Sequence, residues 1–238
     1  MNLFSVLTKL LFPPKCAACG EISDNGQILC GVCLEKYSSE VRRGCPRCGK
    51  SADSCGCVGG EIPVALAFYR GYYSEDAGVL EKLIFSLKGR RNVDLADFFA
   101  RDLARGLIRR LTVEGEKKEK YVLTYLPRSE KNLRRYGFDH GQLLCSRISL
   151  YSGISEERLF HRHGGREHKK MDYSGRSCDA VSTLELSKSA EVRGKRVILV
   201  DDVITTGATV NRAAELLYMN GADRVMCAVI ARTAKRKK

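Results

Sequence analysis

Residues 196–217, RVILVDDVITTGATVNRAAELL, constrain the fold more than any other part of this chain. Residues 196–200 have the apolar pattern of a buried strand, two adjacent acids follow, and a turn rich in Thr and Gly leads into a helical pattern. A strand followed closely by a helix is typical of α/β proteins with a parallel sheet. We therefore predict an α/β domain in which Asp201 and Asp202 lie at the end of a strand, beside a helix N-terminus.

The turn after this strand has the composition of a phosphate-binding site. Backbone N–H groups at a helix N-terminus lack partners, and the helix dipole favours negative charge there. The acids would repel a phosphate, so we expect them to accept hydrogen bonds from nearby hydroxyl groups, as on a ribose ring. The stretch therefore predicts a site for a sugar phosphate. Its phosphate contacts would be the hydroxyl groups of Thr205, Thr206 and Thr209 and the backbone at Gly207 and Ala208.

Eight of the eleven cysteines lie between positions 16 and 57 as four closely spaced pairs. Two thiolates separated by two residues can bind one ion when the backbone turns tightly, which Gly20 and Gly49 favour. Two pairs complete a tetrahedral zinc site with no open position for substrate, so we predict one or two structural zinc ions rather than disulfides or redox chemistry. In this order the pairs resemble a double zinc ribbon, although a crossed pairing stays open. One ion would take Cys16, Cys19, Cys30 and Cys33, and the other Cys45, Cys48, Cys55 and Cys57.

The cysteine-rich segment ends near residues 59–63, where we place a domain boundary. The prediction is an N-terminal helix and zinc domain over residues 1–60, followed by an α/β domain over residues 61–238. The zinc segment is too small to fold without metal. We expect a strand pair at 65–73, helices at 74–89, 94–111, 140–153 and 208–220, and strands at 121–127, 196–200 and 224–232.

Charge points to a polyanionic partner. The formal net charge is +13, and a basic surface attracts nucleic acid, acidic lipid or phosphorylated ligands; the alternative is a surface tuned for solubility. No apolar run of roughly 18 residues occurs, so we expect no membrane-spanning helix and a cytoplasmic location. An apolar helical face within residues 1–12 leaves two readings open, a helix packed on its own protein and a helix that makes peripheral contact with a membrane or a partner.

Residues 197–209, VILVDDVITTGAT, resemble the signature of type I phosphoribosyltransferases that binds 5-phosphoribosyl pyrophosphate (PRPP). Residues 125–144, YLPRSEKNLRRYGFDHGQLL, resemble a segment of the ComF family, in which a zinc module precedes a phosphoribosyltransferase domain. Lys88 matches the lysine at a helix end of that family. The resemblance implies a type I phosphoribosyltransferase fold, a mostly parallel sheet flanked by helices, after a double zinc ribbon. It also implies a role in natural competence, the uptake and handling of transforming DNA.

The chain departs from that family at several positions. Asp139-His140 stand where Asn-Gln is usual, and Tyr136 replaces a common Arg. Residues 159–181 follow the family only loosely. All four histidines lie between positions 140 and 168; we expect a mobile basic loop there rather than a metal or general-base site. These changes leave the sugar-phosphate signature intact.

Phosphoribosyl transfer displaces pyrophosphate from the ribose, and its catalysis consists mainly of positioning and electrostatics. The resemblance implies that Asp201 and Asp202 are the catalytic carboxylates. Arg128 is the favoured pyrophosphate contact, and Lys88 and Arg135 are further candidates, with a surface role as the alternative for each. Mg²⁺ is expected to arrive with PRPP, because it prefers substrate oxygens and waters as ligands.

Two functions fit these predictions. In one, the protein is a phosphoribosyltransferase with an unidentified acceptor. In the other, it is a non-catalytic PRPP-binding competence factor that contacts single-stranded DNA or proteins of the competence machinery. A zinc-ribbon transcription regulator is a third option, which leaves the intact signature unexplained.

Overall fold

The structure is a computed structural model that describes residue 11 and residues 13–23, 26–42, 66–73, 78–162 and 183–233. The second predicted zinc site, the predicted domain boundary, the N-terminal helical face and most of the histidine-rich loop lie outside these residues. The described elements are α2 (Gly31–Arg42), β1 (Leu66–Tyr73), α3 (Val79–Gly89), α4 (Val93–Val113), η2 (Lys118–Lys120), β2 (Tyr121–Tyr125), α5 (Glu130–Tyr136), α6 (His140–Ser152), β3 (Phe160–Arg162), β4 (Leu184–Leu186), β5 (Arg196–Ile204), α8 (Ala208–Met219) and β6 (Arg224–Thr233).

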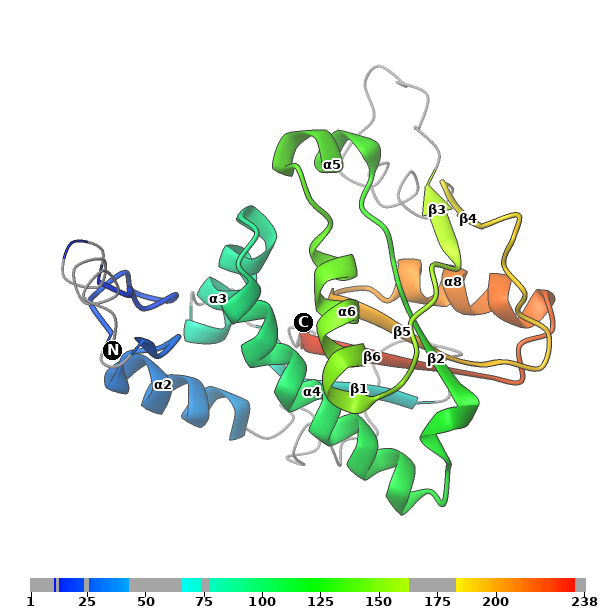
Figure 1. Ribbon diagram of the computed structural model, residues 1–238, viewed down its shortest axis with the longest axis horizontal. Coiled ribbons are helices and arrows are strands. Elements are labelled where there is room, and N and C mark those ends of the chain that lie inside the picture. The colour runs from blue at the N-terminus through cyan, green and yellow to red at the C-terminus, as the bar shows by residue number, and fades with distance from the viewer. Residues whose placement is uncertain are drawn as a thin grey trace, which may run out of the picture.

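Four parallel strands form the central sheet in the order β1-β6-β5-β2 (Figure 1). The last strand in the chain, β6, lies between β1 and β5. Parallel neighbours need long crossover connections, which the helices between the strands supply. A separate antiparallel pair, β3 and β4, stands beside this sheet. The predicted α/β class, a mostly parallel sheet flanked by helices, is confirmed.

The two faces of the sheet pack against different helices. Alternate residues of a strand point to opposite faces. Ile198 and Val200 of β5 join the core formed with α3, α4 and α6, whereas Val197 and Leu199 join the core formed with α8, β3 and β4. The same alternation continues into the two acids, so Asp202 faces α3 and α6 while Asp201 faces the side of α8 and β3.

Helix α3 forms where the apolar spacing predicts it. Its buried side chains include Leu80, Leu83, Ile84 and Leu87, which are at most 2% exposed and belong to the core on one face of the sheet. Burying a leucine-sized side chain contributes about 1.5–3 kcal/mol. This burial fixes the position of α3, and therefore of its last turn, beside the sheet. Helix α2 packs beside α3 at one end of the molecule (Figure 1).

Two local predictions differ from the structure. Residues 66–73 form one strand parallel to β6 rather than a strand pair. Gly71 allows close packing within that strand, since a Cβ on it would lie 2.9 Å from Cδ2 of Leu80. Strand β5 also runs on to Ile204, so the two acids lie within the strand, with Asp201 opposite Val229 of β6. No helix among the described residues has the length and apolar character needed to cross a membrane.

Candidate functional site

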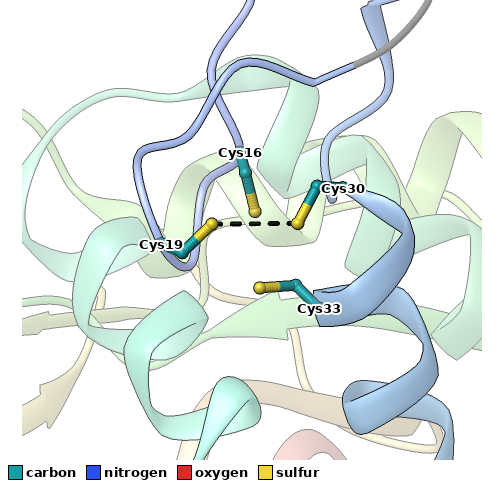
Figure 2. A group of neighbouring side chains, drawn as sticks. All are labelled: Cys16, Cys19, Cys30 and Cys33. Carbon is teal, nitrogen blue, oxygen red and sulfur yellow. Dashed lines mark hydrogen bonds between the residues drawn. The ribbon is translucent and has the colours of Figure 1, made fainter.

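Four cysteines gather beside the N-terminus of α2. The Sγ atoms of Cys16, Cys19, Cys30 and Cys33 all lie within 4.8 Å of one another and point toward a common centre (Figure 2). The Sγ atoms of Cys19 and Cys30 are 3.8 Å apart. Four sulfurs at about 2.3 Å from one tetrahedral zinc ion would be roughly 3.8 Å apart. The cluster therefore fits Zn²⁺, and the predicted first ligand set is the one that the fold brings together.

Two short backbone features present these thiols. Gly20 adopts a left-handed conformation with φ 80°, and its N–H donates to the carbonyl of Cys16 at 2.9 Å, which closes the first turn. Cys30 directly precedes α2, and Cys33 lies in the first turn of that helix. The two pairs thus come from a tight turn and from a helix start.

Without a bound cation, the thiols of the cluster differ in pKa. Burial, together with the neighbouring thiols, raises the pKa of Cys33 to about 12. Burial also acts to raise the pKa of Cys16, but hydrogen bonds from the backbone at Cys30, Cys19 and Ala18 outweigh it and lower that pKa to about 6. Zinc binds thiolates, so its binding here releases protons and supplies the positive charge that four adjacent sulfurs require.

The second group of polar residues surrounds the end of β5. Asp202 is 4% exposed, and its Oδ2 lies 2.6 Å from Nε2 of His140 and 3.1 Å from Nζ of Lys88. Its Oδ1 accepts a hydrogen bond from the N–H of Val203 at 2.7 Å. Burial acts to raise the pKa of Asp202, but His140 and the charge of Lys88 outweigh it and lower the pKa to about 2. Asp202 is therefore a carboxylate held between two basic side chains.

Asp201 has a different environment because it faces the other side of the sheet. Its side chain is partly exposed, and its Oδ1 accepts a hydrogen bond from the N–H of Asp202 at 2.9 Å. Burial, and after it the negative charge of Asp202, raise the pKa of Asp201 to about 7. Burial lowers the pKa of Arg162 on β3, and the charge of Asp201 partly offsets that effect. The guanidinium of Arg162 also donates to the carbonyl of Pro127 at 2.6 Å, which ties β3 to the loop after β2.

The acids offer a poor resident site for Mg²⁺. One atom each of His140, Asp201 and Asp202 lies within 4.8 Å of the others. Mg²⁺ prefers oxygen ligands, however, and one oxygen of Asp202 is already paired with Lys88 and His140. This donor set fits a magnesium ion held chiefly by the oxygens of a bound ligand.

The loop after β2 is held by Arg128. Its backbone N–H donates to Oδ2 of Asp139 at 2.8 Å, and its guanidinium donates to the carbonyl of Lys88 at 2.7 Å. The guanidinium lies 4.7 Å from the ring centre of Tyr136 and 5.3 Å from that of Phe138. Arg128 thus joins this loop to the end of α3 and to the start of α6, next to Asp202.

Arg135 lies apart from the acids. It is exposed, and the contact the structure records for it is with the ring of Tyr136, at 5.3 Å. Nothing in the described part of the chain brings its side chain to Asp201 or Asp202. The fold therefore gathers Lys88 and Arg128 near the acids but leaves Arg135 at the surface.

The predicted phosphate turn lies at the N-terminus of α8. Gly207 adopts a left-handed conformation with φ 81° and, having no side chain, provides no cap for the helix. Thr205 and Thr206 are exposed, and Oγ1 of Thr206 accepts a hydrogen bond from the N–H of Ala208 at 3.3 Å. Thr209 is partly buried in the first turn of the helix. The turn therefore presents hydroxyl groups and a helix N-terminus directly after the strand that carries the acids.

Sequence reasoning missed two residues of this site. His140 was grouped with the histidine-rich loop, yet it is buried in the first turn of α6, directly against Asp202. The available signal was its position immediately after Asp139, the N-cap residue of α6. Arg162 was also passed over. Its sequence neighbourhood carries no distinguishing pattern, and its proximity to Asp201 depends on how β3 packs.

Comparisons with known proteins agree with both parts of this description. Residues 7–62 match the double zinc ribbon domain, and residues 154–238 match the phosphoribosyl transferase domain. Competence protein ComFC of Streptococcus pneumoniae is 26% identical over 233 residues, covering 89% of this chain and 96% of that protein. DNA utilization protein YhgH of Escherichia coli (strain K12) is 27% identical over 216 residues, covering 86% of this chain and 90% of that protein.

A third match is partial. Ribose-phosphate pyrophosphokinase 2 of Archaeoglobus fulgidus is 39% identical over 69 residues, which cover 29% of this chain and 25% of that protein. The two longer matches extend over most of the chain and include both domains. The chain is therefore a homologue of ComFC and YhgH in which a double zinc ribbon domain, with a cysteine cluster suited to zinc, is combined with a phosphoribosyl transferase domain.

Proposed function

We propose that this protein is cytoplasmic, that it binds PRPP together with Mg²⁺ at the end of β5, and that it serves the handling of DNA during natural competence. The observation that carries the proposal is the placement of Asp201 and Asp202 on β5, with residues 205–209 directly after that strand at the N-terminus of α8. The names of the relatives, a competence protein and a DNA utilization protein, support the biological role.

In this proposal each part of the ligand has its own partner. The N–H groups at the start of α8 and the hydroxyl groups of Thr205, Thr206 and Thr209 bind the 5′-phosphate. Asp201 and Asp202 accept hydrogen bonds from the ribose hydroxyl groups. Mg²⁺, when bound with PRPP, neutralises charge on the pyrophosphate.

Lys88 is the residue whose side chain must move when the ligand binds. Its side chain is 41% exposed although its ammonium lies 3.1 Å from Asp202, so it can turn from the carboxylate toward a pyrophosphate. Asp202 then keeps its contact with His140 and can accept a hydrogen bond from a ribose hydroxyl group in place of Lys88. Arg128, already adjacent, adds a second positive charge near the same phosphates.

Turnover separates an enzyme from a binding protein. Transfer would break the bond between the ribose anomeric carbon and pyrophosphate, which leaves with the electron pair, while the acceptor forms the new bond to that carbon. Pyrophosphate release that depends on an added acceptor would establish a phosphoribosyltransferase. Saturable PRPP binding without such release, over a broad screen of acceptors, would establish the non-catalytic alternative.

We expect the affinity for Mg-PRPP to rise with pH because the ionised carboxylate of Asp201 accepts hydrogen bonds from hydroxyl groups more strongly than the neutral acid does. Its pKa of about 7 means that the ionised fraction grows as the pH rises through neutrality, so affinity should increase up to about tenfold from pH 6 to pH 8. Titration calorimetry at several pH values checks this. Asp201→Asn controls for titration of PRPP itself; an equal pH dependence in that variant would contradict the assignment.

A nucleic-acid contact on α4 is favoured by a separate observation. Arg101, Arg105 and Arg109 follow one another at intervals of four residues and, with Tyr151, line a hollow of about 680 Å³. The guanidinium of Arg101 lies 4.9 Å from the ring centre of Tyr151. Single-stranded nucleic acid is typically bound by such combinations of positive charge and aromatic rings. We call these four residues the α4 arginine surface.

The α4 arginine surface predicts salt-dependent binding of single-stranded DNA. Replacing its three arginines by Ala should weaken binding of an oligonucleotide. It should also reduce, by about 2, the magnitude of the slope of the logarithm of the binding constant against the logarithm of the salt concentration. Fluorescence anisotropy over a salt series measures both. Replacing Arg134, exposed on α5, provides a control for loss of charge; equal affinity and slope in the triple variant would place DNA elsewhere or exclude it.

A further inference from the structure

The N-terminus of α3 is capped by a side chain from the zinc-bearing part of the chain. Glu40 of α2 accepts hydrogen bonds from the backbone N–H of Val79 at 2.9 Å and from that of Leu80 at 2.8 Å. The N-cap residue of α3, Gly78, supplies no side chain of its own. Helices α4, α5 and α6 are instead capped by the residue that directly precedes each of them. A cap drawn from about forty positions earlier in the chain joins two parts of the molecule.

The fit of this cap is close. A Cβ on Gly78 would lie 2.8 Å from Oε1 of Glu40, so the carboxylate packs directly against the glycine. Two neighbouring residues of α2 fix the helix there. Val41 is buried, and the ring centre of Tyr37 lies 5.2 Å from that of Phe98 on α4. Helix α2 therefore holds Glu40 at a defined place over the start of α3.

The other end of α3 reaches the carboxylate site. Lys88 lies in its last turn, nine residues or roughly 14 Å along the axis from Val79. Its ammonium contacts Asp202 at 3.1 Å, and its carbonyl accepts the hydrogen bond from Arg128 at 2.7 Å. Because one face of α3 is buried, a shift of its N-terminus also shifts Lys88 at its other end.

We propose that Glu40 is a positioning residue for the PRPP site. By capping α3 it sets Lys88 against Asp202 and Arg128, and the cysteine cluster at the start of α2 supports Glu40 in turn. The zinc ribbon thereby acts on the ligand site through one helix, beyond its part in folding its own segment. This inference rests on the proposed function where it concerns PRPP, and on the contacts of α3 where it concerns Lys88.

The test uses the full-length, zinc-loaded protein and a matched pair of variants. Glu40→Ala removes the cap, Glu40→Gln keeps one acceptor oxygen, and Glu35→Ala removes an exposed acid from the same helix. An N-cap is worth about a fivefold change in an equilibrium constant. Titration calorimetry should therefore show Mg-PRPP affinity falling about fivefold in Glu40→Ala, less in Glu40→Gln and not at all in Glu35→Ala.

A double-variant cycle distinguishes positioning from a general loss of stability. If Glu40 acts through Lys88, then adding Glu40→Ala to the Lys88→Ala variant should lower the affinity for Mg-PRPP less than twofold. The same fivefold loss in both backgrounds would overturn the positioning role. So would unchanged affinity in Glu40→Ala while the wild type binds, and neither result would touch the proposed function.

Hydrogen exchange gives a readout that does not depend on PRPP. We expect amide exchange over residues 83–89 to be faster in Glu40→Ala, and in Gly78→Ala, which displaces the carboxylate without removing it, but unchanged in Glu35→Ala. If the wild type fails to bind Mg-PRPP, the proposed function fails, and this measurement alone decides the link between α2 and Lys88. Exchange that stays the same in both cap variants would refute that link.

Discussion

Replacing both Asp201 and Asp202 by Asn is expected to abolish measurable binding of Mg-PRPP. A hydrogen bond to a charged group contributes about 1.5–3 kcal/mol, and the double variant removes two charged acceptors, so affinity should fall at least about 100-fold. Asn keeps the shape of each side chain and can still pack at the end of β5. Titration calorimetry on wild type and variant, at one salt and Mg²⁺ concentration, measures the difference.

The single variants separate ligand contact from local structure. Asp201 is partly exposed, so Asp201→Asn should weaken binding with little effect on thermal unfolding. Asp202 is buried against His140 and Lys88, so Asp202→Asn should also lower stability. Asp94→Asn, an exposed acid at the start of α4, is the matched control. Wild-type affinity in the double variant would rule out the carboxylates as ligand contacts.

Replacing Cys16 by Ser is expected to remove one zinc ion per chain and to unfold the segment that carries the cluster. Structural zinc contributes about 10–16 kcal/mol to the folding of small zinc domains, because the unfolded chain holds no preformed site. Among the described residues the group around Cys16 contains only Cys19, Cys30 and Cys33, so a lost ligand has no nearby replacement there. Metal analysis of purified protein gives the zinc content, and calorimetric unfolding gives the stability.

Cys145→Ala is the control for this experiment. Cys145 is a buried thiol of α6 and does not belong to the cysteine cluster. That variant should keep the full zinc content. Full zinc content and an unchanged unfolding temperature in Cys16→Ser would contradict the assignment of Cys16 as a ligand.

Local sequence patterns predicted those parts of the fold that depend on local physics. The apolar spacing of α3 placed Leu83 and Leu87 in the core, and the spacing of Cys16, Cys19, Cys30 and Cys33 identified the cluster. Both patterns need only a helix period or a tight turn. The apolar run at residues 196–200 likewise predicted the first part of β5, the strand that carries the acids.

Those local patterns do not predict contacts between residues that are far apart in the sequence. His140 touches Asp202 only because α6 packs against the same face of the sheet as α3. Glu40 caps α3 although no motif links positions 40 and 79. Residues 65–73 were predicted as a strand pair, whereas they contain one strand in which Gly71 packs closely against Leu80. In each case tertiary packing decides the outcome, and a single sequence does not record it.

The central claim is that the end of β5 and the start of α8 form a PRPP site, and calorimetric titration of the zinc-loaded protein with Mg-PRPP tests it most directly. We predict saturable binding of one PRPP per chain, lost in the Asp201→Asn/Asp202→Asn variant. An absence of binding heat at several temperatures, together with unchanged hydrogen exchange at residues 205–211 when PRPP is added, would contradict it.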